Sequence, residues 1–498
     1  MEFALTFPID SMPGMLAETG AHVHAAPVPS LGWIAPFAVL LLVIAVFPLV
    51  PGLNRWWHHN RSKLLVALIL AAITLAYYLT RGFGVAVHDD FAIHLLEKAG
   101  FSMDPAAHPR TPAGAATAVG VFATAMMEYI PFISLLFSLY VISGGISIRG
   151  DIQATPRTNT TFLAIGGLLA SVIGTTGASM LLIRPLLRTN SERKHVVHTV
   201  VFFIFIVSNI GGTLLPIGDP PLFLGYLKGV PFLWTLHLWK EWAFALGVLL
   251  LIYLIWDSRA YDREERRNIV LDMTTINPIS VAGKFNFMLL AGVVFATGTL
   301  SPGKPFLGIE AGWHPFSFCR ELVQLALVGL SLALTPRSVR REVNFNYAAI
   351  LEVACLFIGI FICMQVPIEI LNARGARLGI DTPVEFFWAT GILSSVLDNA
   401  PTYVVFFETA NALTQVHDPG ATIKLLTGHV IRIDHLVAIS LGAVFMGANT
   451  YIGNGPNFMV KSIAEHAGVK MPGFFGYMLF SGFVLIPLFV AITFIFLR

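Results

Sequence analysis

The stretch SNIGGTLLPIGDPPLF (Ser208 to Phe223) interrupts an apolar segment with glycine, proline and polar residues, and FMGANTYIGNGPNF (Phe445 to Phe458) echoes it 235 residues later. Paired helix breakers at matching positions in two halves of an apolar chain mark discontinuous membrane helices. Their free backbone ends and polar side chains form a site near the middle of the bilayer. The pair therefore predicts a secondary transporter. Five residues coincide at this offset: Gly212, Ile217, Gly218, Pro221 and Phe223 fall on Gly447, Ile452, Gly453, Pro456 and Phe458.

The composition indicates a membrane protein. Hydrophobic residues make up 56% of the chain and charged residues 12%, against roughly 45–50% and 25% in soluble domains. Several windows reach the roughly 20 apolar residues that cross a bilayer. The net charge of +2 gives no reason to expect a nucleic-acid partner. The three cysteines, Cys319, Cys355 and Cys363, match neither a metal-ligand spacing nor a disulfide framework, so we expect no cofactor and no resident metal.

Hydropathy and the distribution of Lys and Arg predict an all-α polytopic membrane protein with both termini outside. Pro131 is a candidate break in the third crossing segment. Segment 159–183 is expected to enter and leave on the cytoplasmic side, because only then do the flanking basic clusters Arg149–Arg157 and Arg184–Lys194 both lie inside. A plain span over 159–183 is the alternative. The crossing segments are expected near 33–53, 64–80, 113–148, 196–227, 229–256, 286–300, 321–335, 348–366, 434–467 and 472–497.

A second offset, of 224 residues, extends the repeat beyond the breakers. It aligns Glu128, Phe137, Phe162, Gly167 and Ser171 with Glu352, Phe361, Phe386, Gly391 and Ser395. We therefore predict two inverted five-helix repeats, each with a re-entrant hairpin and a broken helix, as in alternating-access carriers. The predicted units are an N-terminal extracytoplasmic segment 1–32, repeat 33–256 (hairpin 159–183, broken helix 196–227), cytoplasmic linker 257–285, and repeat 286–498 (hairpin 384–411, broken helix 434–467).

Four carboxylates in these segments are candidates for proton coupling. Asp219 lies in the first breaker, Asp398 at the second hairpin tip, and Glu128 and Glu352 at paired positions before each hairpin. An ionisable group in a membrane segment costs at least about 2.5–3.5 kcal/mol, which marks it as functional by default. The alternative for the two aspartates is a helix N-cap. For the two glutamates it is an arginine partner, with Arg184 as one choice, or an interfacial position.

Uncharged ligands gather at the same places. They could hold an ion or a substrate, and the alternatives are interhelical hydrogen bonding for asparagine and bonding to the own helix for threonine. Gly211 and Gly212 are expected to serve close packing, and His198 to be solvated at the end of a span. With Asp219 and Asp398, the ion- or substrate-binding candidates are Thr175, Thr176, Asn209, Thr213, Asn399, Asn449, Thr450, Asn454 and Asn457.

Three of these stretches carry a family resemblance: MEYIPF (Met127–Phe132), ASVIGTTGASMLLIRPLL (Ala170–Leu187) and SSVLDNAPTY (Ser394–Tyr403). With the first breaker, they resemble the ion transporter superfamily, closest to NhaD-type sodium/proton antiporters and citrate transporters. The resemblance implies inverted repeats with re-entrant hairpins and, commonly, a homodimer. In the superfamily's anion symporters the hairpin tips read Ser-Asn-Thr, whereas here they read Gly-Thr-Thr (from Gly174) and Asp-Asn-Ala (from Asp398). A fixed charge beside an anionic substrate would repel it.

Two functions remain open on this basis, and an enzyme is not expected. The first is a sodium/proton antiporter of the bacterial inner membrane, exporting Na⁺ (or Li⁺) for H⁺ through Asp219 and Asp398. The alternative is a sodium- or proton-coupled citrate or dicarboxylate carrier, for which neither breaker supplies a Lys or Arg. Pro216-Ile217-Gly218 before Asp219 is not the GxGD pattern of membrane aspartyl proteases, and no HExxH motif occurs. The expected partners are therefore Na⁺, H⁺, the lipid bilayer and a second copy of the chain.

Overall fold

The structure is a computed structural model that describes residues 27–87, 90–101, 110–274, 277–302, 306, 309, 313–375, 378–416, 421–426 and 428–498. Of the expected N-terminal segment 1–32, all but residues 27–32 lie outside these ranges. The protein is an all-α polytopic membrane protein. Within the described ranges, five helices are long and apolar enough to cross a bilayer: Asn60–Thr80, Ala115–Ser143, Phe232–Tyr261, Ala348–Arg374 and Phe474–Phe496. Shorter apolar helices cover Leu31–Val46, Val197–Thr213, Phe285–Thr299 and Ile433–Asn449.

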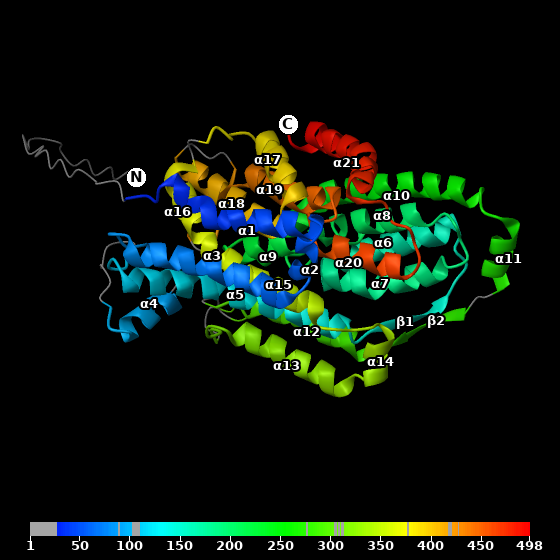
Figure 1. Cartoon of the computed structure of the whole chain (residues 1–498), viewed down its shortest axis with the longest axis horizontal. Coiled ribbons are helices and arrows are strands. Elements are labelled where there is room, and N and C mark those ends of the chain that lie inside the picture. The colour runs from blue at the N-terminus through cyan, green and yellow to red at the C-terminus, as the bar shows by residue number, and fades with distance from the viewer. Residues whose placement is uncertain are drawn as a thin grey trace, which may run out of the picture.

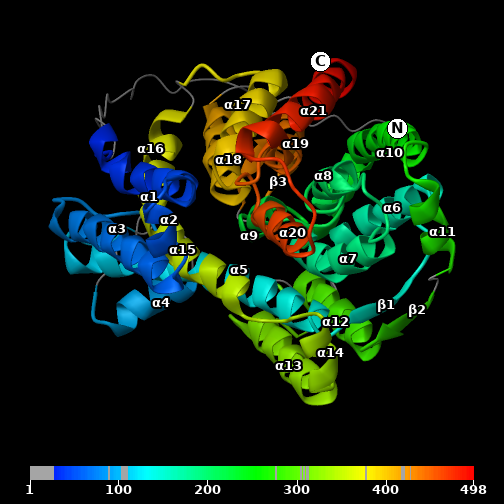
Figure 2. The same ribbon diagram turned by 45° about the vertical axis from the view of Figure 1, so that its right-hand side comes forward.

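The helices form two groups, which Figure 2 shows side by side. In the first, bundle A, α3 packs on α1, α5 and α15, and α5 also packs on α12 and α13. Bundle A consists of α1 (Ala35–Val46), α3 (Asn60–Thr80), α5 (Ala115–Ser143), α12 (Phe285–Thr299), α13 (Cys319–Leu334) and α15 (Ala348–Cys363). Its connections contain α2 (Leu53–Trp57), α4 (Asp90–Lys98), α14 (Arg337–Glu342) and 3-10 turns over Leu31–Ile34 and Phe47–Leu49.

The second group, bundle B, holds the predicted hairpins and broken helices. It consists of α6 (Pro156–Ile173), α7 (Thr175–Thr189), α8 (Val197–Ile206), α9 (Pro220–Leu227), α10 (Trp239–Tyr261, after a 3-10 turn over Phe232–Leu238), α17 (Pro383–Val396), α18 (Asn399–Val416), α19 (Ile433–Met446), α20 (Gly455–His466) and α21 (Phe474–Phe496). Helix α16 (Gln365–Arg374) continues α15 and packs on α18, so it joins the two bundles.

An aromatic contact also joins the bundles. Phe132 of α5 stacks on Phe357 of α15, with ring centroids 4.8 Å apart, and on Phe223 of α9 at 6.4 Å. All three rings are buried. Phe132 follows Pro131, the expected break, but α5 runs through that proline without interruption. Proline removes one backbone hydrogen bond, and a membrane helix packed between neighbours tolerates the loss.

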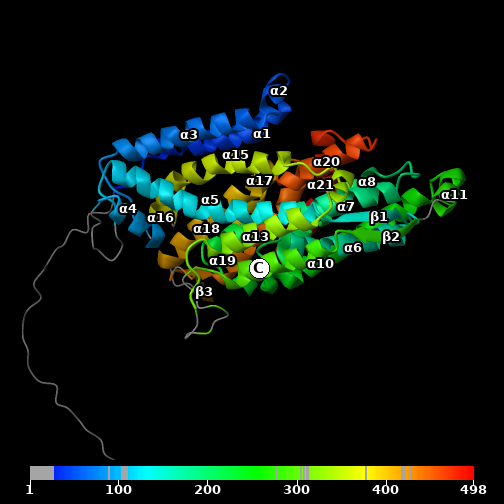
Figure 3. The ribbon, with the colours of Figure 1, turned by 90° about the horizontal axis from the view of Figure 1, so that it is seen from below.

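Two short antiparallel ribbons were not anticipated. Strand β1 (Ser147–Asp151) pairs with β2 (Asn277–Ala282), and β3 (Thr422–Lys424) pairs with β4 (Val430–Arg432). The first ribbon ties the entrance of hairpin α6–α7 to the expected linker 257–285. That linker is structured: α10 extends to Tyr261, and α11 (Arg266–Thr274) precedes β2. Helices α4 and α11 lie at opposite ends of the long axis of the molecule (Figures 1 and 3).

The first helix break packs so closely against α6 of the first hairpin that their backbones are in contact. A Cβ atom on Gly211 would lie 2.6 Å from the carbonyl oxygen of Gly167 and 2.7 Å from that of Ile206. Both neighbours are backbone atoms and cannot rotate away. The expectation that Gly211 serves close packing therefore agrees with the structure.

We predict that Gly211→Ala lowers the free energy of unfolding by about 1–3 kcal/mol, the usual cost of overpacking. Gly247→Ala is the matched control, since a Cβ there would meet no atom within 4 Å. This substitution also removes a glycine from the interior of α10. It should be neutral or stabilising by about 0.5–1 kcal/mol. Thermal unfolding of both variants in detergent tests this, and equal melting temperatures would refute it.

Candidate functional site

In each hairpin the chain turns in the protein interior, and the second helix of the hairpin begins directly after the turn. Gly174 links α6 to α7 with φ 80°, a conformation that favours glycine. The N–H of Thr175, the first residue of α7, donates to the carbonyl of Gly218 (2.8 Å). In the second hairpin α17 ends at Val396 and α18 begins at Asn399. At the open end of hairpin α6–α7, opposite its tip, Asn159 and Asn190 join the two helices through two side-chain hydrogen bonds (2.8 and 3.0 Å).

The two broken helices resume at equivalent residues. After a 3-10 turn over Ile210–Thr213, α9 resumes with Asp219 at its N-cap position, and after a turn over Gly447–Asn449, α20 resumes with Asn454 at its N-cap position. Neither side chain caps its own helix. The capping interpretation of Asp219 is therefore wrong, because this carboxylate faces other elements.

Asp219 is the meeting point of both halves of the chain. Its carboxylate, 1% exposed, accepts hydrogen bonds from Thr175 Oγ1 (2.8 Å), Asn399 Nδ2 (2.7 Å) and Asn454 Nδ2 (3.0 Å). Thr175 and Asn399 are the first residues of α7 and α18, and Asn454 precedes α20. Through these bonds the N-termini of four helices, α7, α9, α18 and α20, converge on one carboxylate.

An asparagine layer surrounds this carboxylate. Asn209 Nδ2 donates to Asn457 Oδ1 (2.7 Å), and Asn454 Nδ2 also lies 3.2 Å from Asn209 Oδ1. Asn457 Nδ2 in turn donates to the carbonyls of Gly447 and Thr450 (both 2.9 Å). The predicted amides of the two breaks thus bond to each other across the two halves.

Asp398 occupies a separate position beside this layer. Its Oδ1 accepts from the N–H of Ala400 (3.0 Å), so this aspartate does act as a cap at the start of α18. Asn449 and Thr450 do not bond to Asp398 but to Ser395, through Ser395 Oγ (2.9 Å) and the Ser395 carbonyl (2.6 Å). Among the described residues, the buried amide oxygens of Asn399 and Asn449 have no hydrogen-bond partner.

The two remaining threonine candidates contribute less. Thr213 Oγ1 donates to the carbonyl of Ile210 in its own turn (2.7 Å). Thr176 is half-buried and, in the part of the chain that the structure describes, its hydroxyl forms no hydrogen bond. Only the first threonine of the tip, Thr175, therefore reaches the central carboxylate.

The paired glutamates form ion pairs away from the centre. Glu128 Oε1 of α5 lies 2.7 Å from Lys228 Nζ, which also contacts Glu408 of α18 (3.0 Å). Glu352 pairs with Lys63 (2.6 Å). Arg184, the possible arginine partner, pairs with neither glutamate, and its Nη1 is buried without a hydrogen bond to any described residue. The lysines supply the countercharge because α3 packs on α15, and α9 ends between α5 and α18.

The offsets of the repeat contain a signal for this geometry that sequence reasoning did not use. An offset of 235 places Asp219 on Asn454, and 224 places Thr175 on Asn399. The matched Ser171 and Ser395 hydroxyls donate to the equivalent carbonyls of Gly211 (2.5 Å) and Met446 (3.1 Å). Residues not anticipated for the site or its surroundings are Ser395, Lys228 and Glu408.

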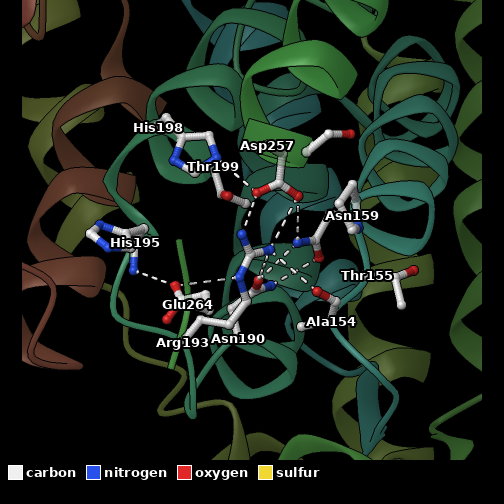
Figure 4. A network of polar contacts seen from close by, with 12 residues as sticks. Ala154, Thr155, Asn159, Asn190, Arg193, His195, His198, Thr199, Asp257 and Glu264 are labelled. Atoms are coloured by element: carbon white, nitrogen blue, oxygen red, sulfur yellow. Dashed lines mark hydrogen bonds and ion pairs between the residues drawn. The ribbon is translucent and has the colours of Figure 1, made fainter. Parts of the chain in front are cut away.

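A second buried polar network holds the open end of hairpin α6–α7 (Figure 4). Arg193 donates from Nη2 and Nη1 to the two oxygens of Asp257 (2.5 and 3.1 Å), and His198 Nε2 lies 2.8 Å from Asp257 Oδ1. Asn159 adds a bond to Asp257 (3.3 Å). His198 is 5% exposed, so the expectation that it is solvated is wrong. These residues clamp the hairpin to α8 and α10, and within the described residues no group of His, Cys, Asp and Glu could hold a metal ion.

Comparison with curated proteins finds no match. The sequence does match the protein family described as "Putative citrate transport", over residues 27–101 and 107–497. These ranges contain both hairpins, both breaks and every residue of the site described above. The chain therefore belongs to this citrate transport family, whose members are membrane transporters.

Proposed function

We propose that the protein is a cation-coupled carrier of citrate or a related carboxylate. The observation that carries the proposal is the convergence of four helix N-termini and four asparagine side chains around Asp219. Helix N-termini favour anions through their free N–H groups and dipoles. The family description supports this carrier better than the sodium/proton antiporter that was the first expectation from the sequence.

The charges at the site give a reason for coupling. Four helix N-termini contribute about +0.5 each, or about +2 together. Asp219 and Asp398, both ionised, offset about the same amount. A cation or a proton bound at these aspartates then leaves the site positive, and an anion binds. The fixed negative charge then does not repel the substrate, because the cation or proton neutralises it before the anion arrives.

The ligands for the coupling cation lie beside the carboxylates. The unpartnered amide oxygens of Asn399 and Asn449 are hard oxygen ligands of the kind that hard cations prefer. Asp398 directly precedes Asn399, and its second carboxylate oxygen, Oδ2, accepts no hydrogen bond from a described residue. We propose Na⁺ or H⁺ as the coupling ion at this position.

Sodium/proton antiport remains the second candidate, since one observation favours it. In the described part of the chain, neither Asp219 nor Asp398 has a Lys or Arg within ion-pairing distance. Both carboxylates could therefore exchange a sodium ion for a proton without first breaking an ion pair.

The wider arrangement follows from the same proposal. The equivalent bonds of Ser171 and Ser395 support two repeats, and α4 and α11 at opposite ends of the molecule fit an outer and a cytoplasmic surface. We propose inverted repeats working by alternating access, in a homodimer in the bacterial inner membrane, with 257–285 in the cytoplasm.

Calorimetric titration of the purified protein with sodium, with and without citrate and at two pH values, separates the two candidates. For the carrier, citrate should tighten sodium binding and sodium should tighten citrate binding by the same factor, because linkage is reciprocal. For the antiporter, citrate should have no effect. Sodium binding should instead weaken as the pH falls, because protons compete for the same carboxylates. Below the pKa of the site the loss should be about tenfold for each pH unit and for each proton exchanged. Proton competition without a citrate effect would overturn the proposal.

A further inference from the structure

The last turns of α10 carry a surface groove that the carrier site does not use. Its volume is about 480 Å³, and it is lined by Ile252, Ile255, Trp256, Arg259, Ala260 and Arg263. These residues recur every three or four positions, so they form one stripe along the end of the helix. Figure 1 shows α10 running outward to the end of the molecule where α11 lies.

The stripe changes from apolar to cationic along the helix. Ile255 is 44% exposed and faces outward like the other apolar residues of a membrane surface. Trp256 follows and is held in place by stacking on Phe480 (centroids 5.8 Å apart) and His198 (6.3 Å). Tryptophan concentrates at the level of the lipid headgroups, so Arg259 near the end of α10 and Arg263 in the turn after it lie at or just beyond that level.

The two arginines are paired with no acid in the part of the chain that the structure describes. In the described residues, the side chains of Arg259 and Arg263 form no ion pair or hydrogen bond, and both are exposed. Of the neighbouring acids, Glu264 is buried and accepts from the backbone N–H groups of Lys194 and His195. Glu265 pairs with Lys194. Asp262 is the exposed acid that remains beside the groove.

The segment that follows extends this surface. Arg266 and Arg267 begin α11, which turns across the end of α10 in Figure 1. Val270 (57% exposed) and Met273 (51%) present apolar side chains from the same short helix. A helix with cationic and exposed apolar residues in this position suits the membrane surface.

We propose that the groove binds an anionic phospholipid. The headgroup phosphate accepts hydrogen bonds from Arg259 and Arg263, and the first part of an acyl chain lies along Ile252, Ile255 and Trp256. Guanidinium groups bind phosphate oxygens with paired hydrogen bonds, and anionic lipids give the cytoplasmic leaflet its negative surface. The site is distinct from Asp219 and does not depend on which cargo the protein carries.

The test is native mass spectrometry of the full chain, loaded from vesicles of phosphatidylcholine and phosphatidylglycerol in equal parts. Arg259→Gln with Arg263→Gln should weaken phosphatidylglycerol binding about 25-fold, at about fivefold per arginine. Arg337→Gln with Arg341→Gln is the matched control, because these exposed arginines have the same spacing on α14 but do not line this groove. Ile255→Gln keeps both charges. It should weaken phosphatidylglycerol binding without changing the thermal stabilisation by inorganic phosphate.

Equal losses in the two arginine pairs would overturn the proposal, because they would show general attraction to a charged surface. A thermal stabilisation by inorganic phosphate that matches that of the lipid, and that disappears in the Arg259/Arg263 variant, would also overturn it in favour of a soluble anion. Ile255→Gln serves as the deciding variant if the double variant does not fold.

Discussion

Asp219→Asn is expected to abolish cation-coupled transport in liposomes while the protein remains folded. The carboxylate accepts three hydrogen bonds from Thr175, Asn399 and Asn454. An amide has one accepting oxygen, and it turns an N–H₂ group towards at least one of these donors. Each lost hydrogen bond to a charged group costs about 1.5–3 kcal/mol, and the coupling cation loses its counterion. Citrate uptake should fall to the level of protein-free vesicles.

Two further variants make this result specific. Asp262→Asn removes an exposed carboxylate and should leave uptake unchanged. Asp219→Asn combined with Asn454→Asp exchanges the two N-cap residues and returns one carboxylate to the centre, so sodium binding should partly recover. Uptake at the wild-type rate by Asp219→Asn alone would exclude this aspartate from the mechanism.

Lys228→Met should cause the largest loss of stability, about 3–5 kcal/mol in the free energy of unfolding. Removing one partner of a buried ion pair leaves an uncompensated buried charge, and here two largely buried carboxylates lose their partner, Glu128 and Glu408, whose side chains are 17% and 7% exposed. Adding Glu128→Gln and Glu408→Gln removes these charges and should restore most of the loss. Denaturant titration in mild detergent measures the three free energies.

The control for this prediction is a single pair whose acid is exposed, since the side chain of Glu465 is 42% exposed and that of Glu408 is 7% exposed. Lys461→Met breaks an i,i+4 contact with Glu465 on α20, which is worth about 0.2–0.5 kcal/mol. If Lys228→Met were no more costly than Lys461→Met, or if the triple variant were no more stable than Lys228→Met, the ion triad would not stabilise the fold.

Local chemistry made the helices and their interruptions predictable. Gly174, Pro220 and Pro456 cannot continue a regular helix in the way that leucine or alanine can, and the structure interrupts its helices beside them. Apolar length gave the crossing segments. Pro131 shows the limit of this reasoning, because neighbouring helices decide whether a proline breaks a helix.

The contacts between distant segments could not be read from the sequence in this way. Asn209 and Asn457 are 248 residues apart, and their pairing depends on how both halves pack. Lys228 was missed because a lysine at the end of a span usually reaches solvent, whereas α9 ends between α5 and α18. The ribbon β1–β2 was missed because each strand alone is short and its partner is distant in the sequence.

The bond between Asp219 and Asn454 bears on why the two halves share one chain. Equivalent residues that touch on a two-fold axis must be identical in a symmetric pair of separate subunits. Two aspartates there would repel each other, and two asparagines would carry no charge. Joining the halves in a single polypeptide allows one to keep the acid and the other its amide, so this pair of equivalent positions carries a single negative charge.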